Sequence, residues 1–247
     1  MKKKKYIFAA AFPFVLILAG AGFYFSKKYS VPIARKDNLQ SRIGEKAEKA
    51  ELALPEKIML EVPFTSQAPL GNWQDVREQN GCEEASLLMV MAWARGESIS
   101  PEAAAREIQN MSDYHLEAHG HFHDLSNADT LHLLNEYFKY FKARLVEDIG
   151  TEDIKKELAA GKPVIVPING ATIGNPNYEP PGPTNHKIVI IGYDEAAREF
   201  ITHDPGTSRG KSYRYGYEIL EKSLEDYPTG LHEKFPERKT SMIVVEK

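Results

Sequence analysis

A single cysteine, Cys82, is the residue of this sequence best suited to covalent chemistry. It stands in the segment 80–85, Asn-Gly-Cys-Glu-Glu-Ala, at the start of a strongly apolar run. Unpaired backbone N–H groups at a helix start favour a thiolate and lower the pKa of a thiol, so this position suits a nucleophile. The alternative is a small, buried and inert side chain, because free cysteine often serves that purpose. Glu83 and Glu84 oppose a thiolate unless they point away and complement the helix dipole.

A nucleophilic cysteine needs a base, and the base needs a residue that fixes its tautomer. Of the eight histidines, His186 directly precedes an apolar strand-like run, 187–191. The chain then turns and returns along 199–202, so an antiparallel hairpin brings His186 close to Asp204. We therefore expect Asp204 to orient the imidazole of His186, although Asp-Pro-Gly at this point also suits an ordinary turn.

Helices are expected before strands, and this order predicts an α+β domain with an antiparallel sheet. The run 83–95 is apolar all round and predicts a helix buried in the core, ended by Gly96. Ser100 with Pro101 opens a second helix, and Thr151 caps a fourth that stops at Gly161. The third helix is expected over 128–142, with an apolar stripe formed by Leu131, Leu134, Phe138 and Phe141. Strands are expected over 59–62, 164–168, 188–191, 199–202 and 242–245.

The N-terminal part of the chain differs from the rest. Residues 6–25 form an uncharged apolar run, with four lysines before it and two directly after it. A run of 20 residues is long enough to cross a bilayer, and the lysines favour a cytoplasmic N-terminus. We therefore expect a retained signal anchor at 1–28, a polar spacer at 29–57 and an extracytoplasmic domain at 58–247. The alternative is a cleaved signal peptide, because Ala19-Gly20-Ala21 resembles a cleavage site.

Charge and cysteine content exclude some classes of protein. Residues 29–247 carry 25 Lys and Arg against all 35 acidic residues, a formal charge of −10. A domain this acidic is not expected to bind nucleic acid. One cysteine cannot form a disulfide within the chain, so the fold depends on its core.

Three blocks of the sequence resemble the bacteriocin-processing-like cysteine peptidases of family thirty-nine, which have a papain-like fold. The blocks are Val-Pro-Phe-Thr-Ser-Gln at 62–67, Gly-Cys with Ala-Ser at 81–86, and Asn-His followed by His-Asp-Pro within 185–205. The resemblance covers about 58–245 and implies a catalytic helix packed on an antiparallel sheet. It implies that Cys82 is the nucleophile, His186 the base, Asp204 the orienting residue and Gln67 the oxyanion donor. Glu83-Glu84 depart from the Gly-Pro that follows the cysteine in many members.

Three weaker signals remain. Four histidines gather in 115–123, where a polar loop is favoured over metal binding because the hydrolytic zinc motif is not met. The long segment 173–184 leads directly into His186, and we expect it to form a substrate-side flap. Trp73 is expected either beside the site or in the core.

Together these observations predict a membrane-anchored extracytoplasmic cysteine hydrolase that cleaves a peptide or other amide bond through a thioester acyl-enzyme. Its partners would be a peptide or protein substrate and the membrane, and no cofactor is implied. A non-catalytic peptide-binding or adaptor domain of the same fold is one alternative. A transferase that passes an acyl or peptidyl group to an amine is the other.

Overall fold

The computed structural model describes residues 54–230 and 232–247, which belong to one compact unit. The predicted membrane-spanning run 6–25 and most of the predicted spacer 29–57 lie outside the described residues. Among the residues that are described, no helix combines the length and the apolar character needed to span a bilayer.

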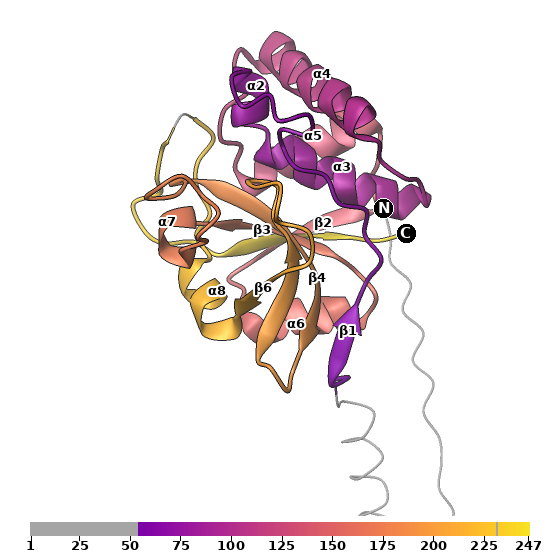
Figure 1. The fold of residues 1–247 in the computed structure, drawn as a ribbon, viewed down its shortest axis with the longest axis vertical. Helices are drawn as coiled ribbons and strands as arrows, with labels where there is room; N and C mark the ends of the chain where they lie inside the picture. Colours follow the sequence, from indigo (N-terminus) through magenta and orange to yellow (C-terminus); the bar gives the residue numbers. More distant parts are fainter. Residues whose placement is uncertain (1–53, 231) are drawn as a thin grey trace, which may run out of the picture. The chain divides into compact units, whose positions relative to one another are not determined.

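Seven strands of the described chain form one antiparallel sheet (Figure 1). The order is β2-β7-β3-β4-β5-β6, and β1 pairs with the C-terminal end of β4. Their bounds are β1 Lys57–Met59, β2 Ala143–Glu147, β3 Val164–Ile168, β4 His186–Asp194, β5 Glu199–His203, β6 Tyr213–Gly216 and β7 Ser241–Val245. The predicted α+β class with an antiparallel sheet is confirmed.

Helices cover both faces of this sheet (Figure 1). Their bounds are α2 Val76–Gln79, α3 Cys82–Arg95, α4 Pro101–His119, α5 Asn127–Phe138, α6 Thr151–Ala159, α7 Gly170–Ile173 and α8 Tyr217–Ser223. Leu87 of α3 and Leu134 of α5 pack in one core cluster, on the face to which Val189 of β4 points. Leu158 of α6 packs in a second cluster with Ile188. Adjacent residues of a strand point to opposite faces, so β4 contributes to both cores.

The buried helix predicted over 83–95 is confirmed as α3. Gly96 ends it in the left-handed conformation with φ of 70°, which a residue without Cβ adopts at little cost. Ser100 caps α4 as expected, because its side chain accepts a hydrogen bond from the backbone N–H of Ala103 at 3.2 Å.

Several predicted boundaries were wrong. Helix α5 ends at Phe138, and the chain then leaves as β2 to pair with β7, so Phe141 is 72% exposed rather than in an apolar stripe. The first strand is Lys57–Met59 rather than 59–62, because Ile58 pairs with Tyr193. Gly150, not Thr151, is the N-cap of α6. The sequence patterns did not predict β2, β6, α2, α7 or α8.

The histidine-rich segment 115–123 is only in part the expected polar loop. Helix α4 continues to His119 and ends at Gly120. His115 is buried, and its Nδ1 lies 2.6 Å from the backbone oxygen of His121. His115 and His119 lie on one helix face, with ring centroids 4.5 Å apart.

Candidate active site

Cys82 is the first residue of α3, as the sequence predicted. The turn before it is tightly packed, because a Cβ on Gly81 would lie 2.8 Å from both the Arg77 backbone oxygen and the Ile108 side chain. Only glycine therefore fits between α2 and α4 at this point. The Cys82 thiol is free and buried, and the residue lines a cleft of about 480 Å³.

The thiol is hydrogen-bonded to its neighbour in sequence. Cys82 Sγ donates to Glu83 Oε2 at 3.0 Å, and the Glu83 side chain is buried. Of the two glutamates, Glu83 therefore does not point away from the thiol, whereas the buried Glu84 turns to Ser112 and accepts from its Oγ at 3.3 Å. Burial and the adjacent Glu83 carboxylate raise the pKa of the Cys82 thiol well above its ordinary value. The helix start alone therefore does not make this thiol a thiolate at rest.

His186 begins β4 and contacts Asp204, which follows the last residue of β5. The hairpin pairing places Val189 opposite His203, and it brings His186 Nε2 to 2.9 Å from Asp204 Oδ1. With Nε2 engaged by the carboxylate, Nδ1 is the ring nitrogen left to accept a proton. The predicted contact between the two side chains is present.

Asp204 is fully buried and accepts hydrogen bonds on both oxygens. Oδ1 accepts from His186 and from the backbone N–H of Gly206 at 3.0 Å. Oδ2 accepts from Tyr178 at 2.5 Å, from Tyr215 at 2.6 Å and from Asn175 Nδ2 at 3.1 Å. Burial acts to raise the pKa of Asp204, but the charge and hydrogen bonds of its neighbours outweigh burial and hold the pKa below its ordinary value.

The imidazole of His186 is also confined by packing. A Cβ on Gly206 would lie 2.8 Å from His186 Cε1, so glycine is required there. The Tyr178 ring meets the imidazole edge to face, with ring centroids 5.5 Å apart. These contacts fix the position of the ring relative to Asp204.

Gln67 is buried on the wall of the cleft that also carries Cys82. Its Nε2 donates to the backbone oxygen of Gln79 at 2.7 Å, and its backbone N–H donates to the Pro205 oxygen at 2.9 Å. An amide nitrogen has two hydrogens, so one N–H of Gln67 remains for another acceptor. Gln79 also lines the cleft, but unlike Gln67 it is exposed. Gln74 is exposed and does not line the cleft.

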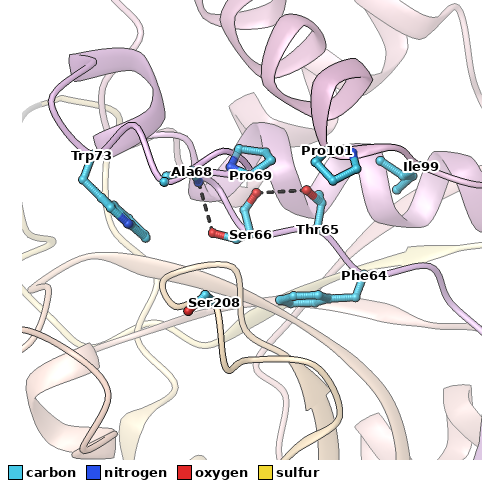
Figure 2. A pocket seen from close by; sticks show the side chains of 10 residues that line it. Phe64, Thr65, Ser66, Ala68, Pro69, Trp73, Ile99, Pro101 and Ser208 are labelled. Carbon is cyan, nitrogen blue, oxygen red and sulfur yellow. Dashed lines mark hydrogen bonds between the residues drawn. The ribbon is translucent and has the colours of Figure 1, made fainter.

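The segment before His186 also lines the cleft. Residues 178–183 line it, followed by Asn185 and His186. A second hollow, of about 310 Å³, is lined by Trp73 together with Phe64, Ser66 and Ser208 (Figure 2). Trp73 is 37% exposed and lines both spaces, so it lies beside the site rather than in the core.

The histidines of α4 lie around a separate hollow, lined by His115, His119, His121, Asp129, His132 and Thr229. In the part of the chain that the structure describes, no group of three or more His, Cys, Asp or Glu residues is arranged to hold a metal ion.

The comparisons with known proteins agree with this fold. Residues 59–229 match the model of the family described as "Peptidase_C39 like family", and the chain belongs to that family. By family, the protein is a cysteine peptidase. No match was found among curated proteins.

Three solved structures are similar to this chain. The first is described as a C39-like peptidase from Bacillus anthracis, with 17% identity and a TM-score of 0.51, and the match covers 78% of this chain and 99% of that chain. The second is xylellain, a cysteine protease from Xylella fastidiosa, with 14% identity and a TM-score of 0.46 over 79% of this chain and 87% of that chain. The third is the peptidase domain of Streptococcus ComA, with 14% identity and a TM-score of 0.39 over 78% of this chain and 100% of that chain.

The sequence did not identify the groups that surround Asp204 and Glu83. Tyr215 lies on the unpredicted strand β6, and Asn175 and Tyr178 lie in the segment that was noted only as a flap. Lys187 was read as part of an apolar strand, yet its buried ammonium lies 3.6 Å from Glu83 Oε1. A lysine within an otherwise apolar strand was the sequence feature that could have indicated this buried ion pair.

Proposed function

We propose that this chain hydrolyses peptide or related amide bonds, with Cys82 as nucleophile, His186 as base, Asp204 as orienting residue and Gln67 as oxyanion donor. The observation that carries the proposal is the 2.9 Å contact between His186 and Asp204 at the edge of the cleft that Cys82 and Gln67 also line. A peptide or protein is the expected substrate.

The reaction follows from these contacts. Asp204 holds the hydrogen of His186 on Nε2, so Nδ1 accepts the proton of Cys82 while the sulfur attacks the substrate carbonyl carbon. The remaining N–H of Gln67 and the backbone N–H of Cys82, which has no partner within the first helical turn, are suited to bind the oxyanion. The imidazolium then gives its proton to the leaving amine, and a thioester remains on Cys82. Water, deprotonated by His186, attacks the thioester and releases the acid and the thiol.

The test is peptide hydrolysis by purified protein, followed by mass spectrometry of a mixed peptide library. We expect His186→Ala to abolish cleavage without loss of fold. His119→Ala, which changes an exposed histidine outside the cleft, is the matched control and should cleave at the parent rate. Equal cleavage by His186→Ala and the parent would remove the proposed base.

A non-catalytic peptide-binding domain is the second candidate, and one observation favours it. The Cys82 thiol donates to Glu83, and burial with the nearby carboxylate raises the pKa of the thiol. Selective peptide binding without any product from the same library would favour this function over hydrolysis.

We also propose that residues 6–25 hold the domain on the extracytoplasmic side of a membrane. The support is the length of the uncharged run and the lysines on either side of it. Recovery in the membrane fraction with an intact N-terminus is expected. An N-terminal sequence beginning at Gly22 would instead establish cleavage.

A further inference from the structure

A buried group of charged and polar side chains contacts Glu83, the residue to which the Cys82 thiol donates its hydrogen bond. Glu83 Oε1 accepts from the Tyr227 hydroxyl at 2.9 Å and lies 3.6 Å from Lys187 Nζ. Lys187 also donates to Tyr227 at 3.0 Å and to the backbone oxygen of Leu125, and its ammonium lies 4.2 Å from the centre of the Tyr227 ring. Glu83 is 1% exposed and Lys187 is 0% exposed.

This group is costly to bury and is not used by the proposed reaction. Removing two ions from water costs several kcal/mol for each ion, and apolar residues of similar size often serve a fold equally well. Lys187 follows His186 in β4 and therefore points to the opposite face of the sheet, toward α3. The group thus joins the element that carries the nucleophile to the element that carries the base.

The contacts assign different tasks to the two oxygens of Glu83. Oε1 faces Tyr227 and Lys187, which supply a hydrogen bond and a positive charge. Oε2 is left to accept the thiol proton of Cys82. Only the protonated sulfur can donate this bond, so the contact favours the thiol over the thiolate.

We propose that Glu83 is a positioning residue that holds Cys82 as a neutral thiol at rest, and that substrate entering the cleft releases the thiol to His186. The inference rests on the proposed function for its second step. On release, the hydrogen bond to Glu83 Oε2 is lost. The S–H bond then breaks as an N–H bond forms at His186 Nδ1, and the sulfur lone pair forms the bond to the substrate carbon. Glu83 keeps its contacts to Tyr227 and Lys187 throughout.

Other titratable groups face this pair, and each has partners of its own. Asp124 accepts from Asn185 Nδ2 at 3.2 Å and from the His232 backbone N–H at 2.6 Å. Glu84, the next residue of α3, is bonded to Ser112 and has no contact with the thiol. Glu84 therefore provides a matched control, since it is an adjacent glutamate of equal burial.

The experiment measures the rate of alkylation by iodoacetamide against pH, with adduct formation at the single cysteine followed by mass spectrometry. Glu83→Gln keeps an oxygen that can accept the thiol proton but removes the charge. We expect its pH midpoint to fall by at least about one unit, which makes alkylation roughly tenfold faster below both midpoints. Glu84→Gln should keep the midpoint of the parent.

If Glu83→Gln fails to fold because Lys187 loses its partner, the double variant Glu83→Gln/Lys187→Met removes both charges and serves the same measurement. An unchanged or higher midpoint in the folded variant would overturn the proposal, as would an equal fall in Glu84→Gln. Alkylation needs only the thiol. Its outcome is therefore separate from whether the protein hydrolyses peptides.

Discussion

Replacement of Asp204 tests whether this buried carboxylate orients His186. Asp204→Ala removes an acceptor that receives five hydrogen bonds, among them those from His186, Tyr178 and Tyr215. Hydrogen bonds to charged groups contribute about 1.5–3 kcal/mol each, but neighbouring bonds are not additive. Removing one partner of a buried pair costs about 3–5 kcal/mol, and we expect Asp204→Ala to lower the free energy of unfolding by that amount.

Asp204→Asn should be less severe. Its amide oxygen can take the place of Oδ1 and keep the bonds from His186 and Gly206. The hydroxyls of Tyr178 and Tyr215 can turn to accept from the new N–H₂ group, whereas the Asn175 amide keeps Tyr215 Oη and loses its second acceptor, Asp204 Oδ2. We expect a loss of about 1–3 kcal/mol in the free energy of unfolding, since one N–H of the buried Asn175 amide is left without an acceptor. Hydrolysis should be slower than in the parent but faster than in Asp204→Ala.

The assays are urea denaturation and peptide hydrolysis under conditions where each variant is folded. Asp194→Asn is the matched control, because Asp194 ends β4 at the other end of the same hairpin and pairs with Lys57 and Arg214. Its hydrolysis rate should equal that of the parent. Parent-like hydrolysis by Asp204→Ala, or an Asn variant no faster than Ala, would refute the orienting role.

Three further predictions concern the same site. Gln67→Ala should lower the rate of acylation by about 10²–10³ with little change in stability, because one oxyanion donor is lost; a loss with Gln79→Ala alone would reassign the donor. Tyr178→Phe should slow hydrolysis and lower the free energy of unfolding by about 1.5–3 kcal/mol, measured by urea denaturation, because a hydroxyl bonded to the Asp204 carboxylate is removed; unchanged stability would show that this bond contributes nothing. The pKa of Asp204 is lower in the folded protein than in the unfolded chain, so its contribution to stability is present above the unfolded pKa and is lost as pH falls through the folded pKa. The parent should therefore lose more stability below about pH 4 than Asp204→Asn does, and parallel pH curves for the two proteins would contradict this reasoning.

The parts of the site that depend on local pattern could be predicted from the sequence. Cys82 was placed correctly because an apolar run ended by Gly96 specifies a buried helix, and the cysteine stands at its start. The contact between His186 and Asp204 was predictable because a hairpin makes two strand ends neighbours whatever the remainder of the fold.

The parts that depend on distant segments could not be predicted. Glu83 turns inward because Lys187 and Tyr227 meet it, and Tyr227 is 144 residues away along the chain. Strand β2 was not predicted because its pairing with β7 joins segments about a hundred residues apart. Local periodicity carries no information on such partners.

The central claim is that Cys82 is a nucleophile activated by His186 in this cleft. Its most direct test is covalent labelling of the purified protein with a peptide-based electrophile that reacts at the active thiol of cysteine peptidases, followed by intact-mass measurement. We predict one adduct on the parent, none on Cys82→Ala, and labelling of His186→Ala at no more than the rate of free cysteine. Parent-like labelling of His186→Ala, or turnover of a peptide by Cys82→Ala, would contradict the account.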